Sequence, residues 1–205
     1  MGTIVIDFVI DATESASENL PAINLFCDDL IVKGYQKLAP FHDVRYGITV
    51  FYGRDDESKP YLFQGEMFTE DRYRFNRTFD MIEIRAGSAD GKDDIAGGMM
   101  CASRKLEAEE ADLKVMLVFS DSYMERINVQ ETGVLSAQRI YLYLADEKEL
   151  GEVRMNLFWG IPMRNKEHRV DHRLMPCRCS LTDIFDVNQR EARIDRIIDD
   201  ISDVR

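Results

Sequence analysis

Short β-branched, apolar runs alternate along this chain with longer segments of helical periodicity. Runs typical of buried strands are Ile4–Ile10, Val44–Tyr52, Leu113–Phe119 and Arg139–Leu144. Segments with helical spacing of their apolar residues are 17–34, Ile95–Leu106 and Ile184–Ile201. Because strands that alternate with helices form a mainly parallel sheet covered on both faces, the sequence predicts a doubly wound α/β fold.

The remaining elements have weaker signals. Tyr61–Phe68 follows the polar turn Gly53–Pro60, and this short connection predicts a hairpin with an antiparallel second strand. Arg72–Ile84 is predicted as a short helix and Leu174–Cys177 as a last strand. Glu152–Trp159 fits either a strand or a helix, and we favour a helix.

Length and composition fit one globular domain over residues 1–205. The chain is 45% hydrophobic and 31% charged, which excludes a disordered, collagenous or disulfide-dense protein. No apolar run approaches the roughly 18–20 residues of a membrane-spanning helix. No signal peptide is visible either. We therefore expect a cytoplasmic location, with the four cysteines reduced.

The net charge excludes two classes of partner. The 26 Lys and Arg residues against 38 Asp and Glu residues give a net charge of −12. This field repels phosphate backbones and anionic membrane surfaces. Binding to nucleic acid or to a membrane is therefore not expected, and cations or basic partners are the natural attractants.

Polar clusters occupy the positions where an open α/β sheet binds ligands, beyond the carboxyl ends of its strands. Their members are Asp11, Thr13 and Ser15 after the first strand, Asp90, Asp93 and Asp94 before a helix, and Ser120, Asp121 and Ser122 after a later strand. These residues offer carboxylate and hydroxyl oxygens but no nitrogen or thiolate. Such ligands suit Mg²⁺, or Mn²⁺ or Ca²⁺, rather than zinc.

These strings resemble the metal-ion-dependent adhesion site of von Willebrand factor A domains. Asp11-x-Thr13-x-Ser15 resembles the DxSxS or DxTxS signature that opens the site. The segment 87–98, GSADGKDDIAGG, looks like the family string GGGDGPEDVAGGL, in which an acidic residue replaces the usual threonine ligand. Asp93 is the implied ligand here. The segment 115–122, VMLVFSDS, resembles the family strand that ends in TDG, so Asp121 is implied as well.

The resemblance carries further implications for fold and function. It covers roughly residues 4–145 and implies a Rossmann-like, six-stranded sheet of order 3-2-1-4-5-6 with one antiparallel edge. Thr13 and Ser15 are implied to bind the ion directly, and the aspartates directly or through water. The open coordination position would accept a carboxylate from a partner protein. The chain is thus expected to be a non-enzymatic interaction module in an intracellular multi-protein assembly.

Several positions depart from the family pattern. Glu14 and Ser122 stand where the family has Gly, Lys92 stands for Pro, and Asp93 is one methylene shorter than the usual Glu. We expect these changes to affect the choice of ion more than the fold. Asp90 either caps the loop or makes an outer contact to the site, and direct binding of the ion by Asp90 is the less favoured alternative.

Two alternatives remain open for the site itself. Thr13 and Ser15 could instead cap the helix that follows them. A carboxylate cluster with Mg²⁺ also fits a metal-dependent phosphoester hydrolase. Against the hydrolase, the D-x-D-x-T pattern of aspartyl-phosphate enzymes is absent, because Ala and Thr follow Asp11.

A second cluster lies late in the chain. His168, His172, Cys177 and Cys179 together would make a Cys₂His₂ zinc set. We favour the simpler interpretation of core cysteines, because C-x-C is a weaker signal than C-x-x-C and occurs once. Trp159 is either a core residue or an anchor for a partner.

Asp7 is an acidic residue within the first apolar run. We expect it near the start of that strand, as a polar position without a functional role.

Overall fold

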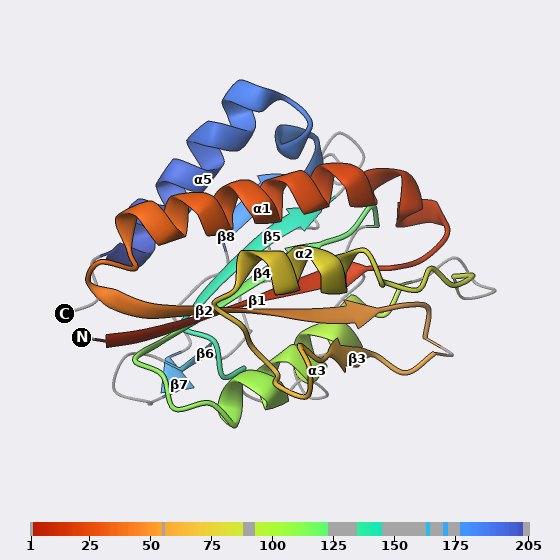
Figure 1. The fold of residues 1–205 in the computed structure, drawn as a ribbon. Helices are drawn as coiled ribbons and strands as arrows, with labels where there is room; N and C mark the ends of the chain where they lie inside the picture. Colours follow the sequence, from red (N-terminus) through yellow and green to blue (C-terminus); the bar gives the residue numbers. More distant parts are fainter. Residues whose placement is uncertain are drawn as a thin grey trace.

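The computed structural model describes residues 2–54, 56–87, 93–122, 135–144, 163–164, 170–171 and 177–202 (Figure 1). Its strands are β1 (Gly2–Asp11), β2 (His42–Phe51), β3 (Lys59–Tyr61), β4 (Leu113–Phe119), β5 (Arg139–Leu144), β6 (Met163–Arg164), β7 (Val170–Asp171) and β8 (Cys177–Ser180). Its helices are α1 (Leu20–Lys37), α2 (Arg72–Phe79), α3 (Ile95–Glu107) and α5 (Val187–Ser202), with 3₁₀ turns η1 (Ser15–Asn19) and η4 (Leu181–Ile184).

Six strands form one sheet in the order β3-β2-β1-β4-β5-β8. All neighbouring pairs are parallel except β2 and β3, so the sheet has one antiparallel edge. The predicted strand order and edge are therefore confirmed. β6 and β7 form a separate two-stranded sheet.

Helices cover both faces of the six-stranded sheet, as predicted. α1, α2 and α5 pack on one face and α3 on the other (Figure 1). Alternate residues of β1 divide between the two cores because side chains of a strand alternate in direction. Ile4, Ile6, Phe8 and Ile10 face α1, while Val5 and Val9 face α3.

The predicted strand Tyr61–Phe68 is wrong in its extent. β3 ends at Tyr61, and the chain then makes a tight turn at Gln64 and Gly65, which have φ angles of 56° and 100°. Phe63 and Glu66 exchange backbone hydrogen bonds of 2.8 and 3.2 Å across this turn. Two consecutive positive φ angles are typical of a two-residue hairpin, which interrupts the expected strand.

Two helix boundaries also differ from the prediction. α1 begins at Leu20 after η1 and extends to Lys37, whereas 17–34 was predicted. α2 ends at Phe79 instead of Ile84, because the following chain leaves the helix to pair with residues 12–14. This tertiary pairing outweighs local helical preference.

The last part of the chain is described in pieces. β8 pairs in parallel with β5, and of the predicted strand Leu174–Cys177 only Cys177 lies within the described residues. The final helix is present as α5, preceded by η4. Glu152–Trp159 lies outside the described residues. Among the described helices, none combines the length and the apolar character needed to cross a membrane.

Asp7 is not at a polar position near the strand start, so that prediction is wrong. It lies in the middle of β1, completely buried on the α3 face. Its carboxylate accepts hydrogen bonds from Lys105 Nζ at 2.7 Å and from Thr49 Oγ1 at 2.8 Å. Lys105 also donates to the carbonyl of Ile48 at 3.1 Å and lies over the ring of Phe68. The pair joins α3 to the centre of the sheet.

Candidate metal centre

The candidate site stands at the carboxyl edge of the sheet, where adjacent parallel strands end together. Ile10 of β1 and Phe119 of β4 are register partners, so the residues that follow them emerge side by side. Asp11 closes β1 and Asp121 follows β4 by two residues. The fold thus brings these two predicted ligands to one place.

Asp93 reaches the same place from the loop that precedes α3. It forms a β-bridge with Gly53, and the amide of Asp94 donates to the carbonyl of Tyr52 at 2.8 Å. Asp94 also caps α3, since its carboxylate accepts from the Gly97 amide at 2.9 Å. These contacts hold the loop end that carries Asp93 beside the end of β2.

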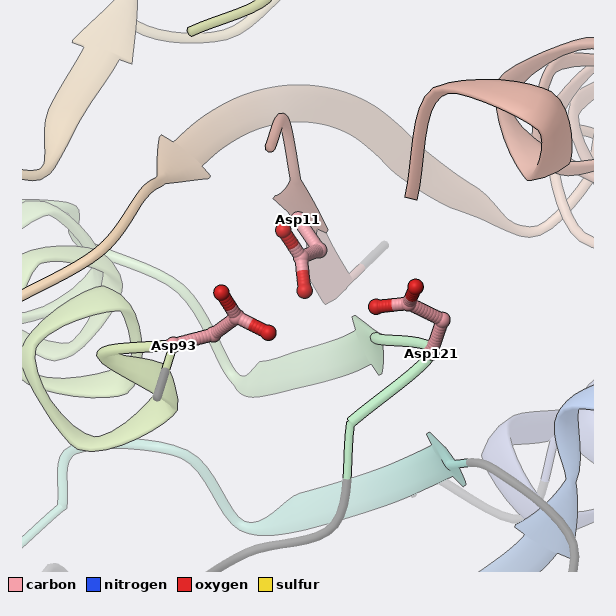
Figure 2. Close-up of side chains that lie close together, drawn as sticks. All are labelled: Asp11, Asp93 and Asp121. Atoms are coloured by element: carbon pink, nitrogen blue, oxygen red, sulfur yellow. The ribbon is translucent and has the colours of Figure 1, made fainter. Parts of the chain in front are cut away.

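The three carboxylates converge on a common centre (Figure 2). One oxygen from each of Asp11, Asp93 and Asp121 lies within 4.8 Å of the others. Asp11 is fully buried, and the other two are partly exposed. Three like charges at this spacing repel one another, so the arrangement favours a cation between them.

The predicted hydroxyl ligands join the cluster through Asp11. Thr13 donates to Asp11 Oδ1 from its amide at 3.1 Å and from its hydroxyl at 2.7 Å. The hydroxyls of Thr13 and Ser15 are 3.1 Å apart. Thr13 is buried and Ser15 is exposed. All five predicted site residues therefore lie together.

The helix-cap alternative for Thr13 and Ser15 is wrong. Glu14 is the N-cap residue of η1 and Asn19 that of α1, and neither cap has a side-chain hydrogen bond. The two hydroxyls are directed to the acidic cluster instead.

Two serines of the 120–122 string hold the acids in place, a role that the sequence did not reveal. Ser120 Oγ donates to Asp11 Oδ2 at 2.6 Å, and Ser122 Oγ donates to Asp93 Oδ2. Ser122 stands where the resembled family has Gly, which has no hydroxyl to donate. The sequence signal that could have indicated this role is the position of the two serines on either side of Asp121.

Burial and mutual repulsion raise the pKa values of two acids of the cluster. Burial raises the pKa of Asp11 to about 7, and the nearby Asp93 charge adds to the rise against the hydrogen bonds from Ser120 and Thr13. Burial also raises the pKa of Asp121, which the hydrogen bond from Ser15 opposes. Oδ1 of Asp121 is buried and has no hydrogen-bond partner among the described residues. A carboxylate oxygen left in this way is available to a cation.

The segment that follows α2 braces the Asp11–Ser15 loop. The Arg85 amide donates to the Ala12 carbonyl at 3.0 Å, and the Glu14 amide donates to the Arg85 carbonyl at 2.8 Å. The Arg85 side chain lies over the ring of Tyr52, 4.8 Å from its centroid. Nothing in the sequence pointed to Arg85, because the pairing depends on where α2 ends.

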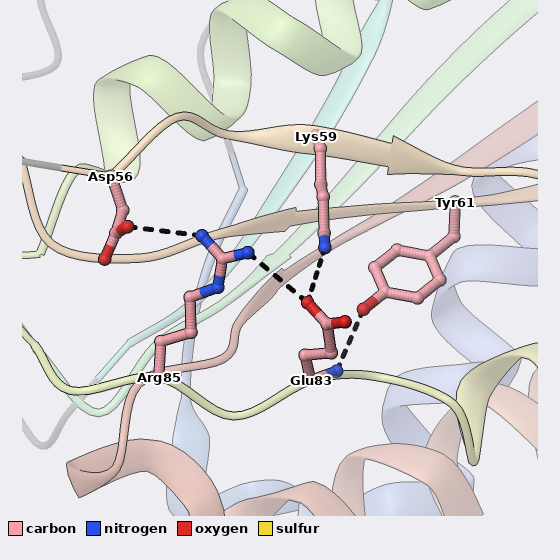
Figure 3. Close-up of polar contacts among 5 residues, drawn as sticks. All are labelled: Asp56, Lys59, Tyr61, Glu83 and Arg85. Carbon is pink, nitrogen blue, oxygen red and sulfur yellow. Dashed lines mark hydrogen bonds and ion pairs between the residues drawn. The ribbon is translucent and has the colours of Figure 1, made fainter.

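A polar network fixes Arg85 on the side of β3 (Figure 3). Its guanidinium donates to Asp56 at 3.2 Å and to Glu83 at 3.3 Å. Glu83 also accepts from Lys59 of β3 at 2.8 Å, and its amide donates to the Tyr61 hydroxyl at 2.9 Å. Although these groups are largely exposed, together they connect Arg85, which pairs with the Asp11–Ser15 loop, to β3 at the antiparallel edge of the sheet.

Several residues singled out from sequence lie outside the described part of the chain. These are Asp90, Lys92, Trp159, His168 and His172. Cys177 and Cys179 are described. They lie two residues apart on β8, so both side chains pack against the core on the α1 face. Their packing agrees with the favoured interpretation of core cysteines, and the Cys₂His₂ zinc alternative is untested.

Comparisons with known proteins place the fold but give no family assignment. No model of a protein family and no curated protein matches the chain. Among solved structures, the PilB minor pilin of Streptococcus sanguinis is 10% identical with a TM-score of 0.64, covering 100% of this chain and 62% of the pilin. Proximal thread matrix protein 1 from the mussel byssus, with a zinc-occupied MIDAS motif, is 16% identical with a TM-score of 0.54, covering 96% and 46%.

A third neighbour is the pilus adhesin SpaC of Lactobacillus rhamnosus GG in its open conformation. It is 12% identical with a TM-score of 0.53, over 98% of this chain and 30% of SpaC. The chain thus spans less than two thirds of each of these proteins. At such identities the likeness shows a shared fold, a mostly parallel six-stranded α/β sheet like that of a MIDAS-containing protein.

Proposed function

We propose that this chain is a metal-dependent protein-interaction module of the von Willebrand factor A type. The observation that carries the proposal is the meeting of three carboxylates from three separate segments within 4.8 Å. Thr13 and Ser15 bind a divalent cation directly, and Asp11, Asp93 and Asp121 bind it directly or through water. The oxygen-only ligand set favours Mg²⁺, with Mn²⁺ or Ca²⁺ as alternatives.

The bound ion would supply an electrophilic coordination position for an oxygen ligand from outside. The chain's own residues prepare that position. Ser120 holds Asp11 and Ser122 holds Asp93, so the acids keep a fixed orientation. An acidic side chain of a partner protein is the matching ligand. Because the net charge of −12 repels an acidic partner at long range, this contact is short-range and requires the metal.

The structural neighbours support this class of function. One is named for a MIDAS motif that holds zinc, and another is a pilus adhesin. We extend the proposal to residues 1–205 as one such domain. The cytoplasmic location and the intracellular assembly stay predictions, and the neighbours named here are pilus and byssus proteins.

Acetate binding to the Mn²⁺-loaded protein tests the open coordination position. Mn²⁺ enhances the relaxation of water protons through the waters it binds, so a carboxylate that displaces water lowers this enhancement. We expect acetate to lower it and acetamide, the uncharged control, to leave it unchanged. Thr13→Ala should lose the Mn²⁺ signal, whereas Thr78→Ala on α2 should retain it. Equal responses to acetate and acetamide would contradict the proposal.

The hydrolase alternative has a separate test. We expect p-nitrophenyl phosphate to show no Mg²⁺-dependent turnover with this protein. Turnover that depends on Mg²⁺ and disappears in Asp11→Ala would instead assign the same cluster to phosphoester hydrolysis.

A further inference from the structure

A groove lies at the opposite end of the sheet from the acidic cluster, beside the start of β2. Its volume is about 870 Å³, and its lining includes Ile31, Val32 and Tyr35 of α1 and Val44 and Tyr46 of β2. β1 and β2 run parallel (Figure 1), and Asp11 of the acidic cluster is the last residue of β1. The groove is therefore at the amino edge of the sheet and is separate from the candidate metal centre.

The edge of β2 beside this groove is open. Tyr46 exchanges two backbone hydrogen bonds with Thr69, of 2.8 and 2.9 Å, and β3 pairs only with Ile48–Val50. Alternate residues of a strand direct their backbone groups to the same side. The N–H and C=O of Val44 thus point away from β1, as those of Tyr46 do. Within the described ranges, no strand pairs with this side of β2 before Tyr46. The His42 amide on this side donates to the Leu38 carbonyl at 2.9 Å, so Val44 is the unpaired position.

The groove and the open edge are arranged to receive one extended chain. The side chains of Val44 and Tyr46 face the α1 side of the sheet and line the groove. A strand added along Val44 would direct every second side chain to that same face. Those side chains would enter the groove, while the backbone would pair with β2. Main-chain pairing combined with side-chain pockets is the usual physics of strand addition.

Charge at the rim selects the chemistry of the incoming chain. Glu70 lines the groove and is exposed, whereas Asp43, also in the lining, pairs with Arg45 at 3.5 Å. Arg72 also lines it, but its guanidinium makes two 2.6 Å hydrogen bonds to Asp28. The rim is therefore negative on balance, and Tyr35, 72% exposed, offers an aromatic face for a cation.

We propose that this groove binds an extended peptide segment of a partner protein by strand addition to β2. The segment pairs with the backbone of Val44 and places a bulky apolar side chain in the groove. An adjacent Lys or Arg faces Glu70. This interaction is independent of the metal centre at the other end of the sheet.

Selection of peptides from a display library of random dodecapeptides on the full chain tests the proposal. We expect enriched sequences to contain a bulky apolar residue close to Lys or Arg. Methylation of alternate backbone nitrogens in a selected peptide should weaken binding about tenfold at the positions that face β2 and little at the others. Hydrogen exchange of the Val44 amide should slow when the peptide binds.

Variants of the chain test whether the peptide binds in this groove. Val32→Glu places a charge in the apolar groove and should abolish peptide binding, while an unchanged circular dichroism spectrum and urea-unfolding midpoint show that the variant is folded. Glu70→Gln should weaken a Lys-containing peptide about two- to fivefold. Chelator and Mg²⁺ should leave the peptide affinity of the unmodified protein unchanged.

Three outcomes would overturn the proposal. The first is a set of selected peptides that bind Val32→Glu as well as the unmodified protein. The second is binding without the alternating effect of N-methylation and without protection of Val44, which would indicate an apolar ligand site only. The third is a concentration-dependent dimer in sedimentation that Val32→Glu dissociates, which would assign the groove to a second copy of the chain.

Discussion

Ser120 Oγ donates a 2.6 Å hydrogen bond to Oδ2 of Asp11, joining the ends of two neighbouring parallel strands across 109 residues of sequence. Both residues are buried, at 1% and 0% exposure. The contact fixes the orientation of a carboxylate whose other oxygen is held by Thr13. The other residues of the acidic cluster lie around this fixed acid.

Ser120→Ala should lower the affinity for Mg²⁺ or Mn²⁺ by about 10- to 100-fold, because Asp11 loses the group that orients it. Calorimetric titration measures this change. Ser202→Ala, which removes a hydroxyl from α5 far along the chain, is the control and should keep the original affinity. Equal metal affinities for the two variants would show that Ser120 does not orient Asp11 for metal binding.

Asp94→Ala should destabilise the fold by about 0.5–2 kcal/mol through loss of the α3 cap. It should also weaken metal binding, because the lost cap frees the first turn of α3 directly after Asp93, although the Asp94 amide that meets Tyr52 is kept. Asp71 caps α2 in the same way, by accepting from the amides of Tyr73 and Arg74. Asp71→Ala should therefore cost similar stability in urea unfolding with no change in metal affinity. A metal affinity that Asp94→Ala leaves intact would contradict this link.

The stability of the metal-free protein should depend on pH through Asp11. Its pKa is about 7 in the folded state against 3.8 ordinarily, so the folded state holds the proton more tightly. The contribution of Asp11 to the free energy of unfolding should therefore be highest below about pH 4 and be lost as pH rises through about 7. Urea unfolding in chelator checks this, with Asp11→Asn as the reference, since Asp7 and Asp121 have raised pKa values too. Added Mg²⁺ at pH 7 should stabilise the unmodified protein more than Asp11→Asn, which lacks the carboxylate. A pH-independent difference in chelator would rule out the proposed titration.

Lys105→Met should destabilise the protein by about 3–5 kcal/mol, because it leaves Asp7 buried without its ion partner. The double variant Asp7→Val with Lys105→Met should lose less, since it removes both charges. Lys33 pairs with Asp195 on the surface, so Lys33→Met is the control and should cost about 1 kcal/mol or less. A double variant as unstable as the sum of its single changes would show that the two residues do not act as a pair.

Much of the fold could be predicted because its signals are local. The apolar run Ile4–Ile10 can only be a buried strand, and the residues after it must then emerge at the carboxyl edge. This reasoning correctly predicted that Asp11 and Asp121 lie close together. Asp93 was reached through the family resemblance, and the structure places it in the same cluster.

The rest depended on contacts between distant parts of the sequence. Lys105 lies 98 residues from Asp7, so nothing local showed that Asp7 would be buried in an ion pair. Arg85 braces the site only because α2 ends early. Ser120 was noted as part of a polar string, yet its role requires knowing which oxygen of Asp11 it meets. The turn at Gln64 and Gly65 was a local signal that the strand prediction overlooked.

The shift in melting temperature on adding Mg²⁺ tests the central claim most directly. A ligand at about 100 times its dissociation constant stabilises the folded state by about 2.7 kcal/mol. For a chain of this length that amounts to roughly 5–10 °C. We predict such a rise for the unmodified protein and for Thr78→Ala, and little or none for Thr13→Ala and Asp121→Asn. The same response to Mg²⁺ in all four proteins would contradict the claim that these residues hold a cation.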